Sequence, residues 1–235
     1  MTILSVCQRL STKIGIARPT VIYASTDRDM YALQEVIADA VLTIKEAHDW
    51  QLFKAIHTLT GDSSAVGFDL PSDYDRMLKT ASLWSSRYLW AMDHVLDTDR
   101  WLELLTLPYT QVTGSWTIYG GQVQILDTMA TGDTAKFFYI KNLPVIGSAA
   151  ATKAAFTADD DSFRLNEDLL RLAIIYKWKQ SKQTAYDEEM SDFNIMLNRM
   201  IDKDGGSKPV VSGRPRSSWK DSGVAWPGTI SGVVP

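Results

Sequence analysis

The sequence is poor in the residues on which most catalytic and metal chemistry depends. Its 235 residues include one cysteine, Cys7, and three histidines, His48, His57 and His94. A single cysteine excludes an internal disulfide and a cysteine-based zinc site, and it fits assembly in a reducing host cytoplasm. No histidine lies in a recognisable nucleophile–base signature, so each is expected to be structural. We therefore expect no catalytic site, no metal and no cofactor.

Long hydrophobic runs are also missing. No apolar stretch approaches the ~20 residues of a membrane-spanning helix. At the N-terminus the charge of Arg9 follows the apolar residues, whereas a signal peptide carries its charge first. With 45% hydrophobic and 22% charged residues, the composition is that of an average globular protein. We expect a soluble chain that makes no membrane contact.

The net charge is unevenly distributed along the chain. The formal net charge is −4, and residues 204–235 hold two lysines, two arginines and two aspartates, net +2, which leaves −6 on residues 1–203. An acidic body is a poor electrostatic match for a protein that grips DNA phosphates with its folded surface. It suits a surface past which DNA slides.

Apolar residues recur at helical spacing near both ends of the chain. A first helix is predicted from Thr2, as N-cap, to the stop at Gly15, and a second follows Thr26, also as N-cap. Helix returns at Asn166, a favourable N-cap, and a break near Ser181 separates two C-terminal helices.

The middle of the chain is predicted to be rich in strands. A hairpin is expected between residues 50–60 and 65–68, and a two-residue turn at Gly120–Gly121 is expected to join two strands. A short helix over residues 98–105, capped by Asp97 or Thr98, interrupts this region, and residues 143–157 are expected to be a surface loop. The remaining strands are expected at residues 82–92, 115–119, 122–126 and 134–140.

The pattern predicts an α+β fold: a helical bundle built from the two ends of the chain, with a β-rich middle insertion. The expected units are N-terminal helices in residues 1–49, a β-rich insertion in 50–162, C-terminal helices in 163–203 and an extended C-terminal arm in 204–235.

The arm combines a composition that resists regular structure with large aromatic side chains. Half of its 32 residues are six glycines, four prolines and six serines. Burying two tryptophans stabilises a chain by roughly 10 kcal/mol, whereas ordering some thirty residues costs at least about 1 kcal/mol each. The arm therefore cannot fold on itself. The arm is therefore expected to bind a partner through five residues: Arg214, Arg216, Trp219, Lys220 and Trp226.

Taken in order, these features resemble the head-to-tail adaptor proteins of tailed bacteriophages, podovirus-like members in particular. The resemblance spans roughly residues 25–203, and its motifs are Trp50–Phe53, the turn at Gly61, Leu70–Arg76, the strand pair around Gly120–Gly121, and Asp160–Leu165 followed by Glu167–Leu170. Podovirus-like members often have a proline where this chain has Asn166–Glu167, a difference that concerns helix capping.

The resemblance implies a structural virion protein, assembled in the host cytoplasm and located at the head-to-tail interface. It implies a homomeric ring, commonly a dodecamer, that docks under the portal protein and offers a surface for tail or nozzle proteins. DNA would pass through the channel without sequence-specific binding, and the C-terminal arm would reach the portal or a neighbouring subunit. At least one helix is expected to line the channel, whose inner surface is expected to be negative.

Three groups of residues suggest other functions. Asp159–Asp161 resembles a calcium loop only in composition, and a solvated turn before a helix is the better interpretation. Glu188 and Glu189 would be the acids of a cell-wall hydrolase, but adjacent residues do not share a helix face. The aromatics Trp84, Tyr88, Trp90 and Trp101 would be the stacking platform of a nucleic-acid-binding module, although no basic groove accompanies them. The hydrolase and the nucleic-acid module remain as alternatives.

Overall fold

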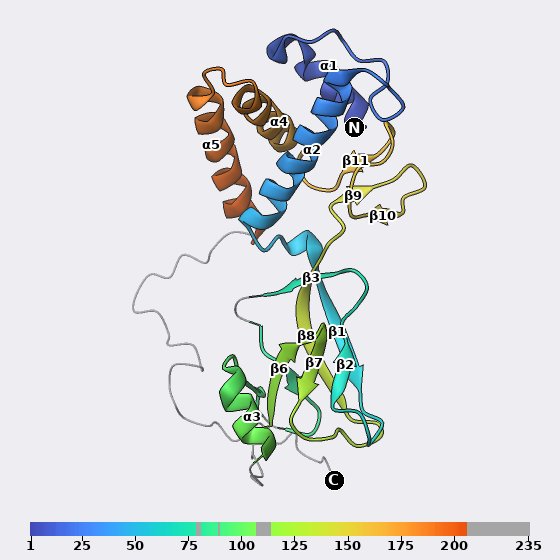
Figure 1. Cartoon of the computed structure of the whole chain (residues 1–235), viewed down its shortest axis with the longest axis vertical. Helices are drawn as coiled ribbons and strands as arrows, with labels where there is room; N and C mark the ends of the chain where they lie inside the picture. Colours follow the sequence, from blue (N-terminus) through green and yellow to red (C-terminus); the bar gives the residue numbers. More distant parts are fainter. Residues whose placement is uncertain (79–80, 89, 107–113, 206–235) are drawn as a thin grey trace, which may run out of the picture.

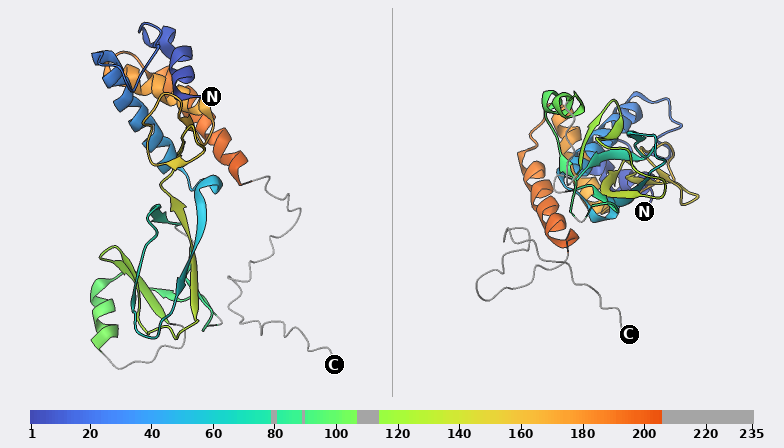
Figure 2. Two further views of the ribbon diagram at one scale, coloured as in Figure 1. Left: turned by 90° about the vertical axis from the view of Figure 1, so that its right-hand side faces the viewer. Right: turned by 90° about the horizontal axis from the view of Figure 1, so that it is seen from below.

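The computed structural model describes residues 1–78, 81–88, 90–106 and 114–205 of the chain. Helices from both ends of this described part lie together, and the middle of the chain forms a β-rich part beyond them (Figure 1). The left-hand view of Figure 2, turned by 90° about the vertical axis, shows the same elongated arrangement, with the helices at one end and the two larger sheets at the other. The structure confirms the predicted α+β class.

The helical part is built around α4. Its helices are α1 (Ile3–Ile14), α2 (Arg28–Ala47), α4 (Glu167–Ser181) and α5 (Asp187–Asp204). Helix α4 packs against α1, α2 and α5, and buried side chains cover most of its circumference, as expected for a helix with neighbours on several sides. The buried residues are Leu169, Leu170, Ala173, Ile174, Ile175, Tyr176 and Trp178.

The helix ends follow the capping chemistry of the sequence. The Thr2 hydroxyl accepts a hydrogen bond from the Ser5 N–H at 3.3 Å, and α1 stops at Gly15, whose φ of +73° is a left-handed conformation that glycine adopts freely. Asn166 accepts from the Leu169 N–H at 3.0 Å and caps α4 as predicted. For α2 the predicted cap is one residue early, because Asp27, and not Thr26, accepts from the Asp29 N–H.

Two sheets make up the β-rich part. In one, β1 (Lys54–Thr60), β8 (Thr134–Lys141) and β3 (Tyr74–Met77) lie in that order, and β4 (Trp84–Ser85) also pairs with β8. In the other, β2 (Gly67–Asp69), β7 (Gln122–Ile125), β6 (Ser115–Tyr119) and β5 (Asp93–His94) lie in that order, flanked by α3 (Thr98–Thr106). The buried side chains of both sheets share one core, which includes Leu59, Trp116, Val123 and Phe137.

The predicted hairpin between residues 50–60 and 65–68 is wrong. Strand β1 pairs with β8 and β2 pairs with β7, so the two segments belong to different sheets. The cause lies in the connecting loop, where the Asp62 carboxylate accepts hydrogen bonds from the N–H groups of Ser64 and Ala65. Gly61 lies so close to the Met129–Ala130 backbone that a Cβ would meet the Ala130 oxygen at 2.4 Å. The chain thereby turns out of the first sheet.

Other strand predictions vary in outcome. The Gly120–Gly121 turn joins β6 to β7 as predicted, with both glycines at positive φ. Most of the strand predicted at residues 82–92 is absent from the described residues, because the Ser85 hydroxyl accepts from the Arg87 N–H and turns the chain. The loop predicted at residues 143–157 instead contains β9 (Val145–Ile146) and β10 (Thr152–Lys153), which form a small sheet with β11 (Ser162–Phe163).

A 3₁₀ turn, η1 (Gln51–Phe53), leads from the helical part into β1. The predicted strand therefore starts at Lys54 and not at Trp50, since Trp50 is buried and its Nε1 donates to the Ile44 carbonyl at 2.8 Å. Among the described residues, no helix has both the length and the apolar character needed to cross a membrane.

Candidate interaction surfaces

Charged side chains join the helical part to the β-rich part. Lys45 in α2 donates from Nζ to Asp75 at 2.7 Å and to the Asn142 side chain at 3.1 Å. Arg76 in β3 in turn contacts Asp75 at 2.9 Å and Asp49 at 3.0 Å. Because Lys45 is only 7% exposed, its charge is stabilised by these partners and not by water. We call these five residues the junction network.

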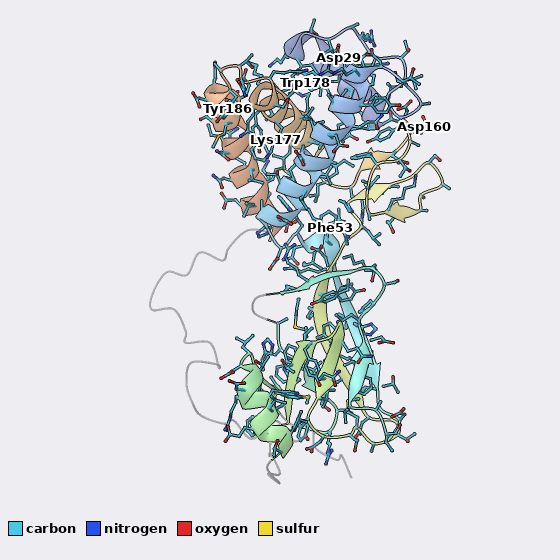
Figure 3. The ribbon with its side chains drawn as sticks, in the orientation of Figure 1. Asp29, Phe53, Asp160, Lys177, Trp178 and Tyr186 are labelled. Atoms are coloured by element: carbon cyan, nitrogen blue, oxygen red, sulfur yellow. The ribbon has the colours of Figure 1, made fainter. Side chains whose placement is uncertain are left out.

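A second contact at the junction involves Phe53, which lies where the two parts meet (Figure 3). Its ring is fully buried and carries the Arg164 guanidinium 5.3 Å above its centre. Arg164 also donates to the carbonyl oxygens of Leu143 at 2.8 Å and Leu52 at 3.3 Å. Segments from three parts of the sequence are thereby held together at the base of β1.

Helix α5 presents an acidic face. It carries four exposed acids, Asp187, Glu188, Asp192 and Asp202. Helical spacing places Asp187, Glu188 and Asp202 on the side opposite Phe193, the one residue of α5 that is buried, and Asp192 at the edge of that side. Two exposed basic residues, Arg199 and Lys203, lie on or beside the same side, so the acids outnumber the bases there by two. We call this side the acidic face of α5.

Both ends of α5 are tied to the body. Near the start, Glu189 pairs with Lys179 of α4. Near the end, Asp204 accepts from the Gln51 N–H at 2.8 Å and lies 3.3 Å from His48 Nε2. These contacts hold α5 in place with its acidic face outward.

Large apolar side chains are exposed at the far end of the β-rich part. Leu96, Leu102 and Leu105, in and next to α3, are 82%, 59% and 52% exposed. The opposite side of α3 buries Trp101 and Leu104 in a small core with Val95. Asp97 caps this helix by accepting from the Asp99 N–H at 3.0 Å. We call the three exposed residues the α3 leucine surface.

Another apolar patch lies on the outer face of the β1–β8–β4 sheet. Ile56 and Phe138 are directly paired across β1 and β8, and Trp84 of β4 lies beside them. All three are at least half exposed, and they line a hollow of about 320 Å³ with Lys136 at its edge. A groove of about 470 Å³ lies between α2 and the segment around the small sheet; it is lined by apolar residues such as Val41, Leu42 and Phe156 and also by the polar residues Gln34, Glu35, Lys45 and Asn142. Exposed apolar patches of this kind are typical of protein–protein contact sites.

The three aspartates before β11 bind the protein itself. Asp159 accepts from the N–H groups of Ile22 and Tyr23, each at 3.0 Å. Asp161 is 1% exposed, so the predicted solvated turn is wrong for this residue. Its carboxylate pairs with Lys153 at 2.8 Å and accepts from backbone N–H groups. Asp160 is exposed beside the small sheet (Figure 3), and no metal-ligand cluster occurs in the described ranges.

Local charges and burial shift the titration of several groups. Burial raises the pKa of Asp161, but the hydrogen bonds from Lys153 and from the backbone of residues 157 and 158 outweigh it, so the net pKa is lowered. Burial raises the pKa of the Cys7 thiol to about 12, helped by the Asp159 carboxylate. Burial has the opposite effect on the imidazoles of His57 and His94 and lowers their pKa, because their charged form is the protonated one.

The histidines pack against aromatic rings. His94 stacks on Trp116 with 4.0 Å between ring centres, and His57 meets Phe137 edge-on at 5.6 Å. His48 follows the last residue of α2, as predicted, and contacts Trp50 edge-on.

The residues of the two alternative functions are not brought together. Glu189 is paired with Lys179 while Glu188 is exposed, so the two carboxylates do not share one environment. Of the proposed stacking aromatics, Trp101 lies on the buried side of α3, whereas Trp84 and Trp90 are about half exposed. These aromatics therefore do not form a single exposed platform.

The five residues predicted to bind a partner lie outside the residues that the structure describes. These are Arg214, Arg216, Trp219, Lys220 and Trp226. Their role stays a prediction. The structure does describe the residue at which the arm starts: Gly205 follows Asp204, which lies at the junction between the two parts.

The comparison that decides the family is a match to a family model. The sequence model described as SU10 adaptor protein matches residues 1–216 of the chain. The chain belongs to the SU10 adaptor protein family. It is accordingly a bacteriophage adaptor, a structural component of the virion. The match ends before Trp219 and Trp226 of this adaptor, and a search of curated proteins found no match.

Sequence reasoning missed the junction network of this adaptor. Lys45 follows Val41 by four residues and so falls on the buried stripe of α2, a position where a lysine needs an acidic partner. That signal predicts a buried ion pair. It does not identify the partner, because Asp75 is distant in sequence. Nor did the sequence single out the α3 leucine surface, since exposed and buried leucines look alike before the helix is placed.

Proposed function

We propose that this adaptor forms a homomeric ring, with twelve subunits expected, between the portal protein of the DNA-filled head and the tail or nozzle proteins. A ring follows from a head-to-tail contact that closes on itself. The exposed apolar patches of the chain, on the β1–β8–β4 sheet and along α2, are suitable for such contacts between subunits.

The observation that carries the proposal is the acidic face of α5. An exposed negative helix would repel the DNA backbone and so let DNA pass without sticking. We therefore propose that α5 lines the DNA exit channel. The opposite side of α5 packs on α4 through Phe193, which leaves the acidic face free to point into a lumen.

The C-terminal arm is proposed to attach the ring. Arg214, Arg216, Trp219, Lys220 and Trp226 would bind the portal or a neighbouring subunit, with the two tryptophans as buried anchors and the three basic residues at the rim. An arm that crosses to another protein adds effective concentration without a large globular interface.

The test is complex formation with the portal protein of the same phage. The full chain is mixed with purified portal, and the product is examined by sedimentation and negative-stain electron microscopy. We expect a ring attached to the portal. A chain that stays monomeric and ignores portal under all conditions would contradict the proposal. Salt-sensitive retention of DNA by isolated subunits would instead favour the nucleic-acid-binding alternative, and clearing of peptidoglycan by the purified chain would favour the hydrolase.

A further inference from the structure

The α3 leucine surface carries negative charge as well as apolar side chains. Residues 93–106 include four acids, Asp93, Asp97, Asp99 and Glu103, all of them exposed, and one base, Arg100, so the segment has a net charge of −3. An occupant that suits this surface offers large apolar side chains flanked by positive charge. The apolar patch on the β1–β8–β4 sheet differs, because Lys136 lies at its edge.

The C-terminal segment of the chain has that complementary chemistry. Residues 206–235 include Trp219 and Trp226, and their four basic residues and one acid give a net charge of +3. We propose that in the unassembled chain the segment 206–235 docks on the α3 leucine surface of its own subunit. This inference goes beyond the proposed function, because it concerns the free chain and requires no ring.

The segment is long enough to reach α3. It starts at the junction, where Asp204 is bound to Gln51, and α3 lies at the opposite end of the β-rich part (Figure 1). Strand β8, which has eight residues and runs from that end to the junction, covers roughly 27 Å at about 3.4 Å per residue. Trp219 follows Gly205 by fourteen residues, which span up to about 46 Å when extended. Trp219 can therefore reach α3 even along an indirect path.

Docking within one chain has a physical rationale. Three leucines exposed together are an aggregation risk in a free subunit. A tethered segment has a far higher effective concentration at this surface than any dissolved partner. Portal or a neighbouring subunit that binds the same residues of the segment would compete with this docking.

The test is disulfide trapping in the full chain. One variant combines Leu102→Cys with Ser218→Cys, and the control combines Ile56→Cys with Ser218→Cys. Leu102 and Ile56 are 59% and 58% exposed, so the two cysteines are matched in accessibility. The native Cys7 is fully buried and does not interfere. Dilute protein is oxidised mildly, and the intrachain disulfide is measured by gel mobility and by mass spectrometry of the linked peptides.

We expect the Leu102 pair to form its intrachain disulfide about 10-fold faster than the Ile56 pair, owing to local concentration. Adding Trp219→Ala and Trp226→Ala, or raising the salt to about 1 M, where the Debye length is ~3 Å, should remove most of this advantage. Equal rates for both pairs, or an advantage that survives the tryptophan substitutions, would overturn the proposal. Disulfides that form only between chains would overturn docking within one subunit. Leu105→Cys provides a second position on the same surface, and portal binding of the unoxidised chain separately tests the proposed function.

Discussion

Nζ of Lys45 in α2 lies 2.7 Å from Oδ1 of Asp75 in β3. The contact joins the helices to the sheets, and Arg76 extends it to Asp49. The junction network therefore fixes the helical part relative to the β-rich part. The proposed role between portal and tail proteins would require this rigidity.

Breaking the network is expected to destabilise the fold. Lys45→Met leaves Asp75 and Asn142 without their ammonium donor in a site largely shielded from water, and we expect a loss of about 2–3 kcal/mol in the free energy of unfolding. Urea denaturation of the purified chain measures the loss. Lys141→Met is the control, because its ion pair with Asp73 is more exposed, and it should cost at most about 1 kcal/mol. Equal losses would show that the junction network stabilises the fold no more than the exposed Lys141–Asp73 ion pair does.

Asp161 is expected to make the fold sensitive to acid. Its pKa is lower in the folded chain than in the unfolded chain, so its stabilisation is fully present above the unfolded value of about 3.9. That stabilisation is lost as the pH falls through the folded pKa. We expect Asp161→Asn to lower the free energy of unfolding by about 2 kcal/mol at pH 7, and the difference from the natural chain should shrink below pH 4. A difference that stays constant down to pH 2 would contradict this assignment.

Reversing charge on α5 is expected to impair DNA passage. Asp187→Lys, Glu188→Lys and Asp192→Lys together make the acidic face basic; all three positions are exposed, so the fold should persist, with a cost of up to about 1 kcal/mol for each lysine placed in the first turn of α5. We expect virions that carry the triple variant to assemble but to eject DNA several-fold more slowly, measured by release of DNA from purified particles. The control reverses Asp39, Glu46 and Asp160, which are exposed outside α5. A similar delay in the control would argue against a channel role for α5.

The tryptophans of the arm are expected to govern attachment and not folding. Trp219→Ala with Trp226→Ala should weaken binding to portal by at least about 100-fold, since each anchor contributes 2 kcal/mol or more at a typical hot spot. The thermal midpoint of the free chain should change by no more than a few degrees. Binding is measured by sedimentation with portal, and Val210→Ala with Val233→Ala serves as the control within the same arm. Unchanged attachment would reduce the arm to a tether.

Cys7 is expected to be unreactive in the folded chain. With its pKa raised to about 12 and its side chain fully buried, almost no accessible thiolate exists at pH 8. A thiol reagent should modify it only after unfolding, and the rate in dilute urea should follow the unfolding equilibrium. Rapid modification under native conditions would show that α1 opens locally.

The helical part could be predicted from the sequence more fully than the β-rich part. Thr2, Gly15 and Asn166 act on groups within a few residues, and their roles in capping α1 and α4 are local chemistry. The partner of β1 could not be predicted, because β8 lies more than seventy residues later and the intervening Asp62 loop looks like a hairpin turn. The Gly120–Gly121 turn was predictable for the opposite reason, since it joins adjacent strands.

The candidate surfaces also divide into features that local sequence determines and features that depend on contacts between distant segments. The acids of α5 could be read from the sequence, but their position on one exposed face depends on where Phe193 packs. The junction network and the α3 leucine surface depend on contacts between distant segments, so they required the structure. The arm residues Trp219 and Trp226 were identified from composition alone, and they lie outside the described residues.

The most direct test of the account is a cryo-electron microscopy reconstruction of the full chain bound to portal. We predict a closed ring of adaptor subunits with α5 facing the lumen and with Asp187, Glu188 and Asp192 nearest the channel axis. A ring with α5 on its outer surface, or with a strongly basic lumen, would contradict the account.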